Sequence, residues 1–283
     1  MTGEVTIRKL DPPLLETMLD WGADEGWNPG LDDAAAFSAT DPEGFLGLFV
    51  DDELTVTISA VQYDARFGFV GFYICRPERR GEGLGVKLFD TALDAIDATT
   101  VGLDGVIAQE QNYAQSGFVT AHHNVRFGGT PDAPTPADHR VRALRTDDVE
   151  KLVAYERDAR VFPAQRRRFL ERWLVPRRTY GFAIDDGDVI AGYGVIRQCR
   201  SGHKIGPLFC ESLTDAEVLL AALLGAIDGG EVFLDVPQPN TRAMQLAREI
   251  GLSPSFETVR MYRGPDPAIA LHRVFGITTF ELG

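Results

Sequence analysis

Cysteine, histidine and long apolar runs are all scarce in this chain of 283 residues. Its three cysteines, Cys75, Cys199 and Cys210, show no CxxC spacing, and none of its five histidines falls in an HExxH pattern. These absences argue against a disulfide framework and against a zinc site, so we expect no metal. No apolar run approaches the roughly 18–20 residues of a membrane span, and the N-terminus "MTGEVTIRKL" lacks the apolar core of a signal peptide. We therefore expect a cytoplasmic protein without a membrane partner.

Lysine is also rare, since it supplies 4 of the 28 basic residues and arginine the other 24. The formal net charge is −14, a field that repels nucleic acid and favours cationic partners. We interpret the arginine-rich stretch 157–178 first as the solvated face of an amphipathic helix, next as a site for an anionic group of a substrate, and last as a nucleic-acid surface. We therefore expect no nucleic-acid partner. The composition leaves open whether the chain is a monomer or a homodimer.

The chain contains a weak internal repeat at an offset of 134 positions. Three matches at different places along the chain share this offset: Arg8 with Arg142, Asp51 with Asp185, and Gly117 with Gly251. The Pro- and Gly-rich segment 128–139 between the repeats is typical of a linker. We predict a first domain at 1–129, a linker at 130–139 and a second domain at 140–283. They are called the first half and the second half below.

Both halves show the same order of expected elements. A short strand precedes helical material, and two apolar runs then flank an Asp-Asp turn typical of a hairpin. An apolar strand, a helix, another strand, a short helix and a last strand follow. The fold class is therefore α/β, with a mixed, mostly antiparallel sheet flanked by helices in each half. The expected ranges are 69–75 and 205–210 for the apolar strand, 84–98 and 215–227 for the helix, and 105–108 and 232–236 for the next strand.

The segment "RPERRGEGLG", residues 76–85, joins the apolar strand of the first half to its helix. Glycines at 81, 83 and 85 would let the backbone approach a ligand closely. The helix that follows offers unpaired N–H groups and the positive end of its dipole, and three arginines add charge. Such a loop is suited to a pyrophosphate, although a tight turn with solvated arginines is the alternative. It spells neither a P-loop nor a dinucleotide-binding GxGxxG motif.

The same segment resembles the acyl-CoA-binding motif of the GNAT superfamily of N-acetyltransferases, R/Q-x-x-G-x-G/A, with Arg80, Gly83 and Gly85 at its three defined positions. The sequence also resembles a subgroup of tandem GNAT proteins with an "EGWNPG"-like segment, here 25–30, in which an ordinary domain is paired with a divergent one. The resemblance implies that acetyl-CoA is the co-substrate. It also implies that the preceding strand pairs with the pantetheine arm. The implied cofactor-binding residues are Tyr73, Ile74, Cys75, Arg79, Arg80, Gly81, Glu82, Gly83, Leu84, Gly85, Val86 and Asn112.

The resemblance further implies a general acid. In the family a tyrosine lies five residues before the Phe of a terminal Gly-Phe, which is Tyr113 here; a phenol there would protonate the leaving thiolate. The alternative is that Tyr113 simply packs beside a helix end. The base is less clear, and we favour Glu25 over Asp24, Glu110, His122 and His123. The candidates for the amine pocket are Trp27, Asn28, Tyr63 and Asp64.

The second half departs from the motif. Thr214, Glu217 and Leu219 stand where the first half has Arg80, Gly83 and Gly85, and Ala247 stands in place of Tyr113. Acidic side chains would repel a pyrophosphate, and Thr214 with Glu217 is a candidate capping box. We expect this half to keep the fold without the acetyl-CoA chemistry and to buttress the first half or cap its amine site. The tail 273–283 is apolar enough to pack across the two halves.

Together these patterns predict an N-acetyltransferase that transfers an acetyl group from acetyl-CoA to a primary amine of a small molecule by direct attack. The alternative is an acyl-CoA sensor or scaffold without turnover. The sequence names neither the amine nor the preferred acyl chain.

Overall fold

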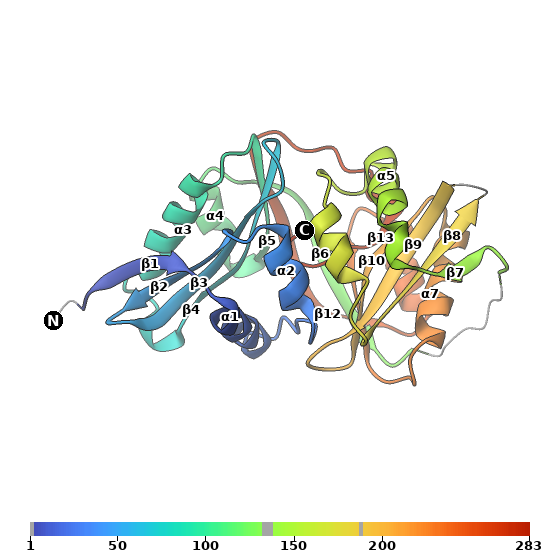
Figure 1. The fold of residues 1–283 in the computed structure, drawn as a ribbon, viewed down its shortest axis with the longest axis horizontal. Coiled ribbons are helices and arrows are strands. Elements are labelled where there is room, and N and C mark those ends of the chain that lie inside the picture. Colours follow the sequence, from blue (N-terminus) through green and yellow to red (C-terminus); the bar gives the residue numbers. More distant parts are fainter. Residues whose placement is uncertain (1–2, 132–137, 187–188) are drawn as a thin grey trace.

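The computed structural model describes residues 3–131, 138–186 and 189–283, and within them the strands form one continuous sheet (Figure 1). Its order is β1-β2-β3-β4-β5-β12-β6-β11-β10-β9-β8-β7, with β13 paired to β10. The strands are β1 Val5–Lys9, β2 Phe45–Val50, β3 Glu53–Gln62, β4 Phe67–Cys75, β5 Thr100–Val106, β6 Val119–Gly129, β7 Val141–Ala143, β8 Thr179–Asp186, β9 Val189–Gln198, β10 His203–Cys210, β11 Val232–Pro237, β12 Ser253–Arg263 and β13 Val274–Gly276.

Helices cover both faces of this sheet (Figure 1). The helix α3 shows why: it buries Leu88, Phe89, Ala92 and Leu93 against the sheet and exposes its polar residues, as a period of 3.6 requires. The helices are α1 Pro12–Asp24, α2 Asp33–Thr40, α3 Leu84–Ala95, α4 Glu110–Gln115, α5 Val149–Ala159, α6 Arg167–Trp173, α7 Leu213–Gly225 and α8 Thr241–Glu249, with short 3-10 turns at Pro77–Arg79, Ile107–Gln109, Thr146–Asp148 and Leu271–Arg273. No helix among the described residues is long and apolar enough to cross a membrane.

The two halves exchange their last strands. In the middle of the sheet, β12 lies between β5 and β6, while β6 lies between β12 and β11 (Figure 1). Asn124 of β6 is the direct partner of Thr258 of β12, and these two residues are 134 positions apart. Because equivalent residues of the two halves pair here in antiparallel strands, a pseudo-twofold axis that relates the halves passes through this residue pair. Each half completes the sheet beside the other half.

Two equivalent buried ion pairs hold the exchanged strands. Arg126 of β6 makes bonds of 2.6 and 2.7 Å to the carboxylate of Asp235 on β11, and Arg260 of β12 makes bonds of 2.7 and 2.6 Å to Asp104 on β5. Both pairs are almost fully buried. Removal of one partner from such a pair leaves an uncompensated buried charge, so the pairs oppose separation of the halves.

The structure corrects several expected boundaries. The strand expected at 105–108 is β5, Thr100–Val106, and a 3-10 turn takes over at Ile107. The helix expected to reach Ala98 ends at Ala95. Most of the predicted linker, residues 132–137, lies outside the described residues.

Two further interpretations of the second half are also corrected. The arginine-rich stretch is not one amphipathic helix, because α5 and α6 are separated by a turn and Arg166 is buried in an ion pair with Glu156. The cap of α7 is not formed by Thr214 and Glu217. Ser212 is the N-cap instead, and its hydroxyl accepts a bond from the backbone N–H of Asp215.

Candidate active site

A fork between β4 and β5 creates a large cavity. Residues Phe67–Val70 of β4 pair in parallel with Thr100–Leu103 of β5, and the pairing stops beyond Val70 and Leu103. At this point β4 bulges, since Phe72 has a φ of 45° and the register with β3 shifts. Residues 71–75 and 104–106 therefore diverge around a cavity of about 570 Å³, which we call the open fork. Among the described residues β4 makes no further pairs with β5 beyond Val70, so this length of β4 can offer backbone groups to an extended ligand.

The glycine loop forms the mouth of the open fork. Gly81 and Gly83 have φ values of 84° and 78°, in the left-handed region that glycine adopts without strain. The first hydrogen bond of α3 runs from Lys87 N–H to the carbonyl of Gly83, so the preceding N–H groups of the first turn have no partner within the helix. They give this end of the cavity a positive dipole. A side chain at Gly85 would collide with the Tyr73 hydroxyl, 2.6 Å from the Cβ position.

Arginines at the mouth are held by carboxylates. Arg79 donates two bonds of 2.8 Å to Glu82. Arg80 donates to the carbonyl of Cys75 at 3.0 Å and forms an ion pair with Glu25. The guanidinium groups remain partly exposed, so an anionic ligand that enters can compete for them.

The middle of the open fork is lined by two phenols. Tyr73 packs on Phe89, and Phe89 packs on Tyr113. The Tyr113 ring lies against Gly105, where a Cβ would approach it within 2.4 Å. Burial raises the pKa of Tyr113, and burial raises the pKa of Tyr73 to about 12. Both phenols therefore keep their protons near neutral pH and can donate them.

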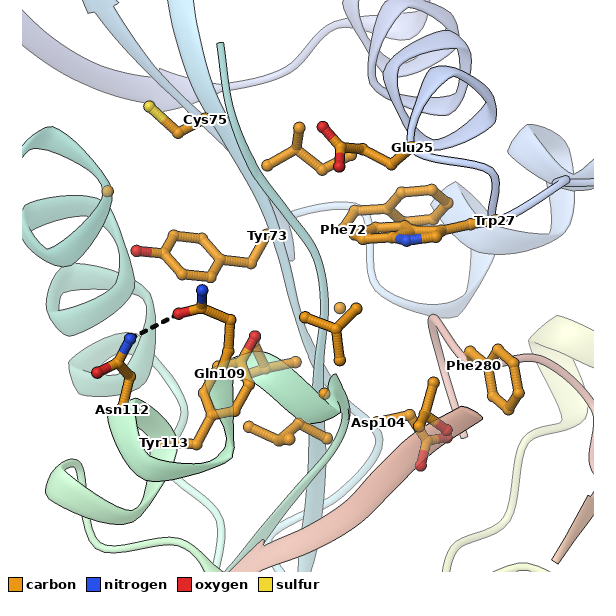
Figure 2. A pocket seen from close by; sticks show the side chains of 18 of the residues that line it. Glu25, Trp27, Phe72, Tyr73, Cys75, Asp104, Gln109, Asn112, Tyr113 and Phe280 are labelled. Atoms are coloured by element: carbon orange, nitrogen blue, oxygen red, sulfur yellow. Dashed lines mark hydrogen bonds between the residues drawn. The ribbon is translucent and has the colours of Figure 1, made fainter. Parts of the chain in front are cut away.

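Beside these phenols, Asn112 donates a 2.6 Å bond to the side chain of Gln109 (Figure 2). This bond connects α4 to the 3-10 turn that follows β5. Tyr73, Gln109, Asn112 and Tyr113 lie toward α3 and α4 in this view, whereas Trp27, Phe72 and Phe280 lie on the opposite side (Figure 2). The open fork is thus divided into a polar, phenol-lined side and an aromatic side.

The inner end of the cavity combines aromatic rings with two acids. Trp27 and Phe72 have ring centroids 6.1 Å apart, and Phe256 and Phe280 have centroids 6.2 Å apart. The lining acids here are Asp104 and Glu281. The rings come from the segment after α1, the β4 bulge, β12 and the C-terminal tail. Both halves therefore build this end, and the tail packs across them as predicted.

The open fork gathers most of the residues singled out from the sequence. Of the predicted site residues, those that line it are Glu25, Trp27, Tyr73, Ile74, Cys75, Arg79, Arg80, Gly81, Gly83, Gly85, Val86, Asn112 and Tyr113. The predicted loop and the predicted acid thus meet in one cavity, although they are separated along the chain by β5. Their roles stay predictions.

Several predicted residues lie elsewhere. Glu82 holds Arg79 from outside the lining, and Leu84 packs against the first-half core. Asn28 bonds through its amide to the backbone of Ser201 in the second half. Tyr63 donates to the carbonyl of Leu282 at 2.8 Å, which ties down the tail.

The other acidic and histidine candidates are also engaged away from the cavity. Asp64 caps the turn before β4 through the N–H groups of Arg66 and Phe67. Glu110 accepts a bond from the Thr120 hydroxyl. Burial, together with Arg260, lowers the pKa of His122 to about 3, so this imidazole is neutral. Neither Asp24 nor His123 lines the cavity.

Sequence reasoning missed the inner end of the site. Asp104 lies on β5 one residue before the expected strand at 105–108, so a more accurate start for that strand would have included it, whereas Gln109 lies on the 3-10 turn that follows β5. Phe256 and Thr258 arrive on β12 through the strand exchange, which no local pattern records. Phe280 and Glu281 belong to a tail beyond the repeat, and that lack of a first-half counterpart is the available signal.

In the second half, the corresponding fork is filled by the protein itself. β10 pairs with β11 over His203–Ile205, and its register with β9 then shifts before Leu208. β13 pairs with β10 beyond this shift, and the Ile277 N–H donates to the carbonyl of Asp235 at 2.9 Å. The C-terminal tail thus occupies the space between β10 and β11 that corresponds to the cavity between β4 and β5 in the first half.

Comparisons of the sequence with known proteins point to one family. The profile described as an acetyltransferase (GNAT) domain matches residues 154–276, within the second half. The holothin acyltransferase of Pseudoalteromonas sp. (strain SANK 73390) is 32% identical over 265 residues, which cover 93% of this chain and 90% of that protein. The second half thus retains the family pattern although its loop has lost the glycines.

Solved structures match the fold over nearly the whole chain. A proposed acetyltransferase from Pyrococcus horikoshii superposes with a TM-score of 0.82 at 21% identity, covering 99% of this chain and 96% of that one. A tandem GNAT protein from the clavulanic acid biosynthesis pathway gives a TM-score of 0.62 at 13% identity, covering 93% of this chain and 100% of that one. These matches confirm the predicted α/β fold of two tandem GNAT-like domains.

Proposed function

The chain belongs to the GNAT acyltransferases, and from this premise we propose that it transfers an acetyl group from acetyl-CoA to a primary amine of a small molecule in the open fork. The observation that carries this proposal is the coincidence of three features in one cavity. These are the glycine loop at the mouth, the unpaired length of β4 along the wall, and Tyr113 beside it. A protonated phenol next to an extended binding strand suits the departure of a thiolate.

Each part of the cavity has a distinct task in this proposal. The first-turn N–H groups of α3 and the arginines of the mouth would bind the pyrophosphate. A backbone N–H of β4 beyond the bulge would polarise the thioester carbonyl. The amine nitrogen would bond to the carbonyl carbon and lose one proton to a base or to water, the carbon–sulfur bond would break, and Tyr113 would give its proton to the sulfur.

The inner end of the cavity favours an acceptor with an apolar body. Trp27, Phe72, Phe256 and Phe280 contribute aromatic side chains to the lining there, whereas a polyamine or an amino sugar would need many polar partners. The relative named holothin acyltransferase is consistent with a small-molecule acceptor. We therefore place arylalkyl and aromatic amines ahead of the cationic amines that the chain's acidity favours.

Calorimetric titration with acetyl-CoA, followed by release of free CoA with a panel of amines, tests the proposal. We expect one site per chain, since the tail fills the second fork. We also expect turnover that is faster with aromatic amines than with spermidine or glucosamine. Binding of two equivalents would contradict the assignment of the second half. Binding without turnover over the whole panel would instead favour an acyl-CoA sensor.

A further inference from the structure

Three acidic residues contribute to the lining of the open fork, and their carboxylates differ in what they contact. Glu25 is paired with Arg80 at the mouth. Asp104 accepts both bonds of Arg260 and a third of 2.8 Å from Asn124. Glu281, on the C-terminal tail, has no hydrogen-bond partner for either carboxylate oxygen among the described residues.

An acid without a partner is costly where Glu281 lies. This residue is 2% exposed, and its backbone packs against Gly71, whose Cβ position is 2.1 Å from the Glu281 carbonyl oxygen. Buried carboxylates in proteins are normally paired or hydrogen-bonded, because desolvation of an unpaired one costs several kcal/mol. An unpaired carboxylate on a residue that lines a cavity therefore calls for an explanation, and a ligand group that reaches it would supply the missing partner.

The place of Glu281 in the fork matches the reacting end. Gly71 is the first β4 residue beyond the paired segment, at the point where β4 and β5 separate. The mouth lies at the other end of that unpaired length, at most roughly 13 Å away, because four fully extended residues span that distance and the bulge at Phe72 shortens it. A ligand anchored by its phosphates at the mouth and extended along β4 would place its far end near Glu281.

We propose that Glu281 accepts the proton that the acceptor amine loses, directly or through one water molecule, when its nitrogen bonds to the thioester carbonyl carbon. This inference rests on the proposed function and names the base that the sequence leaves open. The proton balance closes: Glu281 gains one proton from nitrogen, Tyr113 loses one to sulfur, and both return to their starting states by exchange with solvent. The two groups thus act on opposite ends of the reaction.

The surrounding charges are consistent with this role. Burial raises the pKa of Glu281, and the nearby cations Lys204, Arg126 and Arg197 moderate that rise while Asp33 adds to it. Lys204 itself donates to the carbonyl of Trp27 at 3.0 Å and makes no hydrogen bond to Glu281. A carboxylate whose pKa is moved toward neutrality is a stronger base than a solvated one.

The substitution Glu281→Gln tests the inference, with Glu257→Gln as the matched control. Glu257 is an exposed acid on β12, and as a neighbour of Phe256 and Thr258 along the strand it points to the opposite face. We expect E281Q to lower kcat by about 10²-fold or more while acetyl-CoA affinity stays within about twofold. We expect E257Q to change neither. The assay uses an arylamine that is uncharged from about pH 5 to 9. Any fall in kcat at low pH then reports protonation of a group on the enzyme and not of the amine.

Stability distinguishes a base from a structural counter-ion. A carboxyl whose pKa is raised on folding stabilises the fold below its unfolded pKa and loses that contribution as pH rises through the folded value. Glu281→Gln should therefore melt at the same or a higher temperature than the parent at pH 8. In the parent, kcat should fall at low pH as Glu281 is protonated, and in the variant this fall should be absent.

Three results would overturn the inference. A lower melting temperature with an unchanged pH profile would assign Glu281 to the buried charge cluster, and wild-type turnover by E281Q would remove it from the reaction. Failure of the parent enzyme to acylate any amine would defeat the proposed function and this inference with it. The smaller Glu281→Asp variant serves as the second check, because it should recover part of kcat if a carboxylate is what the step needs.

Discussion

The molecule builds the same fork twice and uses the two copies differently. In the first half β4 and β5 separate at a bulge and leave a cavity, whereas in the second half β10 and β11 separate at the equivalent bulge and β13 enters the space. An inserted strand satisfies the backbone groups that a separated pair exposes. The same backbone opening therefore becomes a binding site or a piece of core, according to what fills it.

The helices that follow the two forks differ in the same sense. The N-cap of α3 is Gly83, which has no side chain to bond the first-turn N–H groups. The N-cap of α7 is Ser212, which bonds the N–H of Asp215 itself at 3.2 Å. The first-turn N–H groups of α3 are therefore available to a ligand. In α7 the Ser212 hydroxyl takes up one of these groups, and the charge of Asp215 would repel a phosphate.

The largest effect we expect is a loss of stability when a side chain of β13 is removed from the fork between β10 and β11. Phe275 lies on β13, 1% exposed within the second-half core. Phe275→Ala should lower the free energy of unfolding by about 3–5 kcal/mol, because it removes a buried ring and leaves a cavity. Urea unfolding measures this loss, and calorimetry on the folded protein should show unchanged acetyl-CoA affinity. The control Val86→Ala alters a 61% exposed residue at the mouth of the open fork and should change stability by less than about 0.5 kcal/mol.

Next in size is the effect of making the open fork resemble the filled one at its mouth. Gly83→Asp places a carboxylate where the second half has Glu217, and we expect acetyl-CoA affinity to fall by about 10²-fold or more through repulsion of the pyrophosphate. Gly83→Asn has the same shape without the charge, and asparagine tolerates the left-handed conformation at this position. Equal losses in both variants would show that the backbone conformation, not charge, controls binding.

A similar effect, confined to the chemical step, is expected at Tyr113. Tyr113→Phe should lower kcat by about 10²-fold with acetyl-CoA affinity nearly unchanged, because the ring still packs on Phe89 and Gly105 while the proton donor is lost. The second half has Ala247 at this position, which is consistent with a fork that does no chemistry. Full kcat in the variant, measured as CoA release, would exclude Tyr113 as the acid and leave the two forks equivalent in this respect.

Local sequence signals predicted the parts of the site that are contiguous in the chain. The glycine loop and the start of α3 at Leu84 follow from turn chemistry and helix period. The placement of Tyr113 beside that loop was implied by the resemblance to the GNAT family, not by a local pattern. The 134-position repeat gave the two halves and also relates their last strands, since β6 and β12 cover equivalent ranges.

Strand neighbours could not be predicted in the same way. An alternating pattern shows which face of a strand is buried, but not which strand lies beside it, so the exchange of β6 and β12 left no local trace. The aromatic residues Phe256 and Phe280 therefore reached the cavity unpredicted. Tyr63 is a candidate for the amine pocket because of its position at a strand end, and in the structure its phenol donates to the carbonyl of Leu282.

The smallest effect separates the two helix ends. Ser212→Ala should lower the free energy of unfolding by about 1 kcal/mol, because the first-turn N–H of α7 loses its side-chain acceptor and no ligand replaces it. Acetyl-CoA should stabilise the variant and the parent by the same amount, since its site lies at the other helix. Thermal melts with and without acetyl-CoA measure both quantities. If acetyl-CoA restored the lost stability in Ser212→Ala alone, it would be binding at the start of α7, and the two halves would differ in affinity, not in the presence of a site.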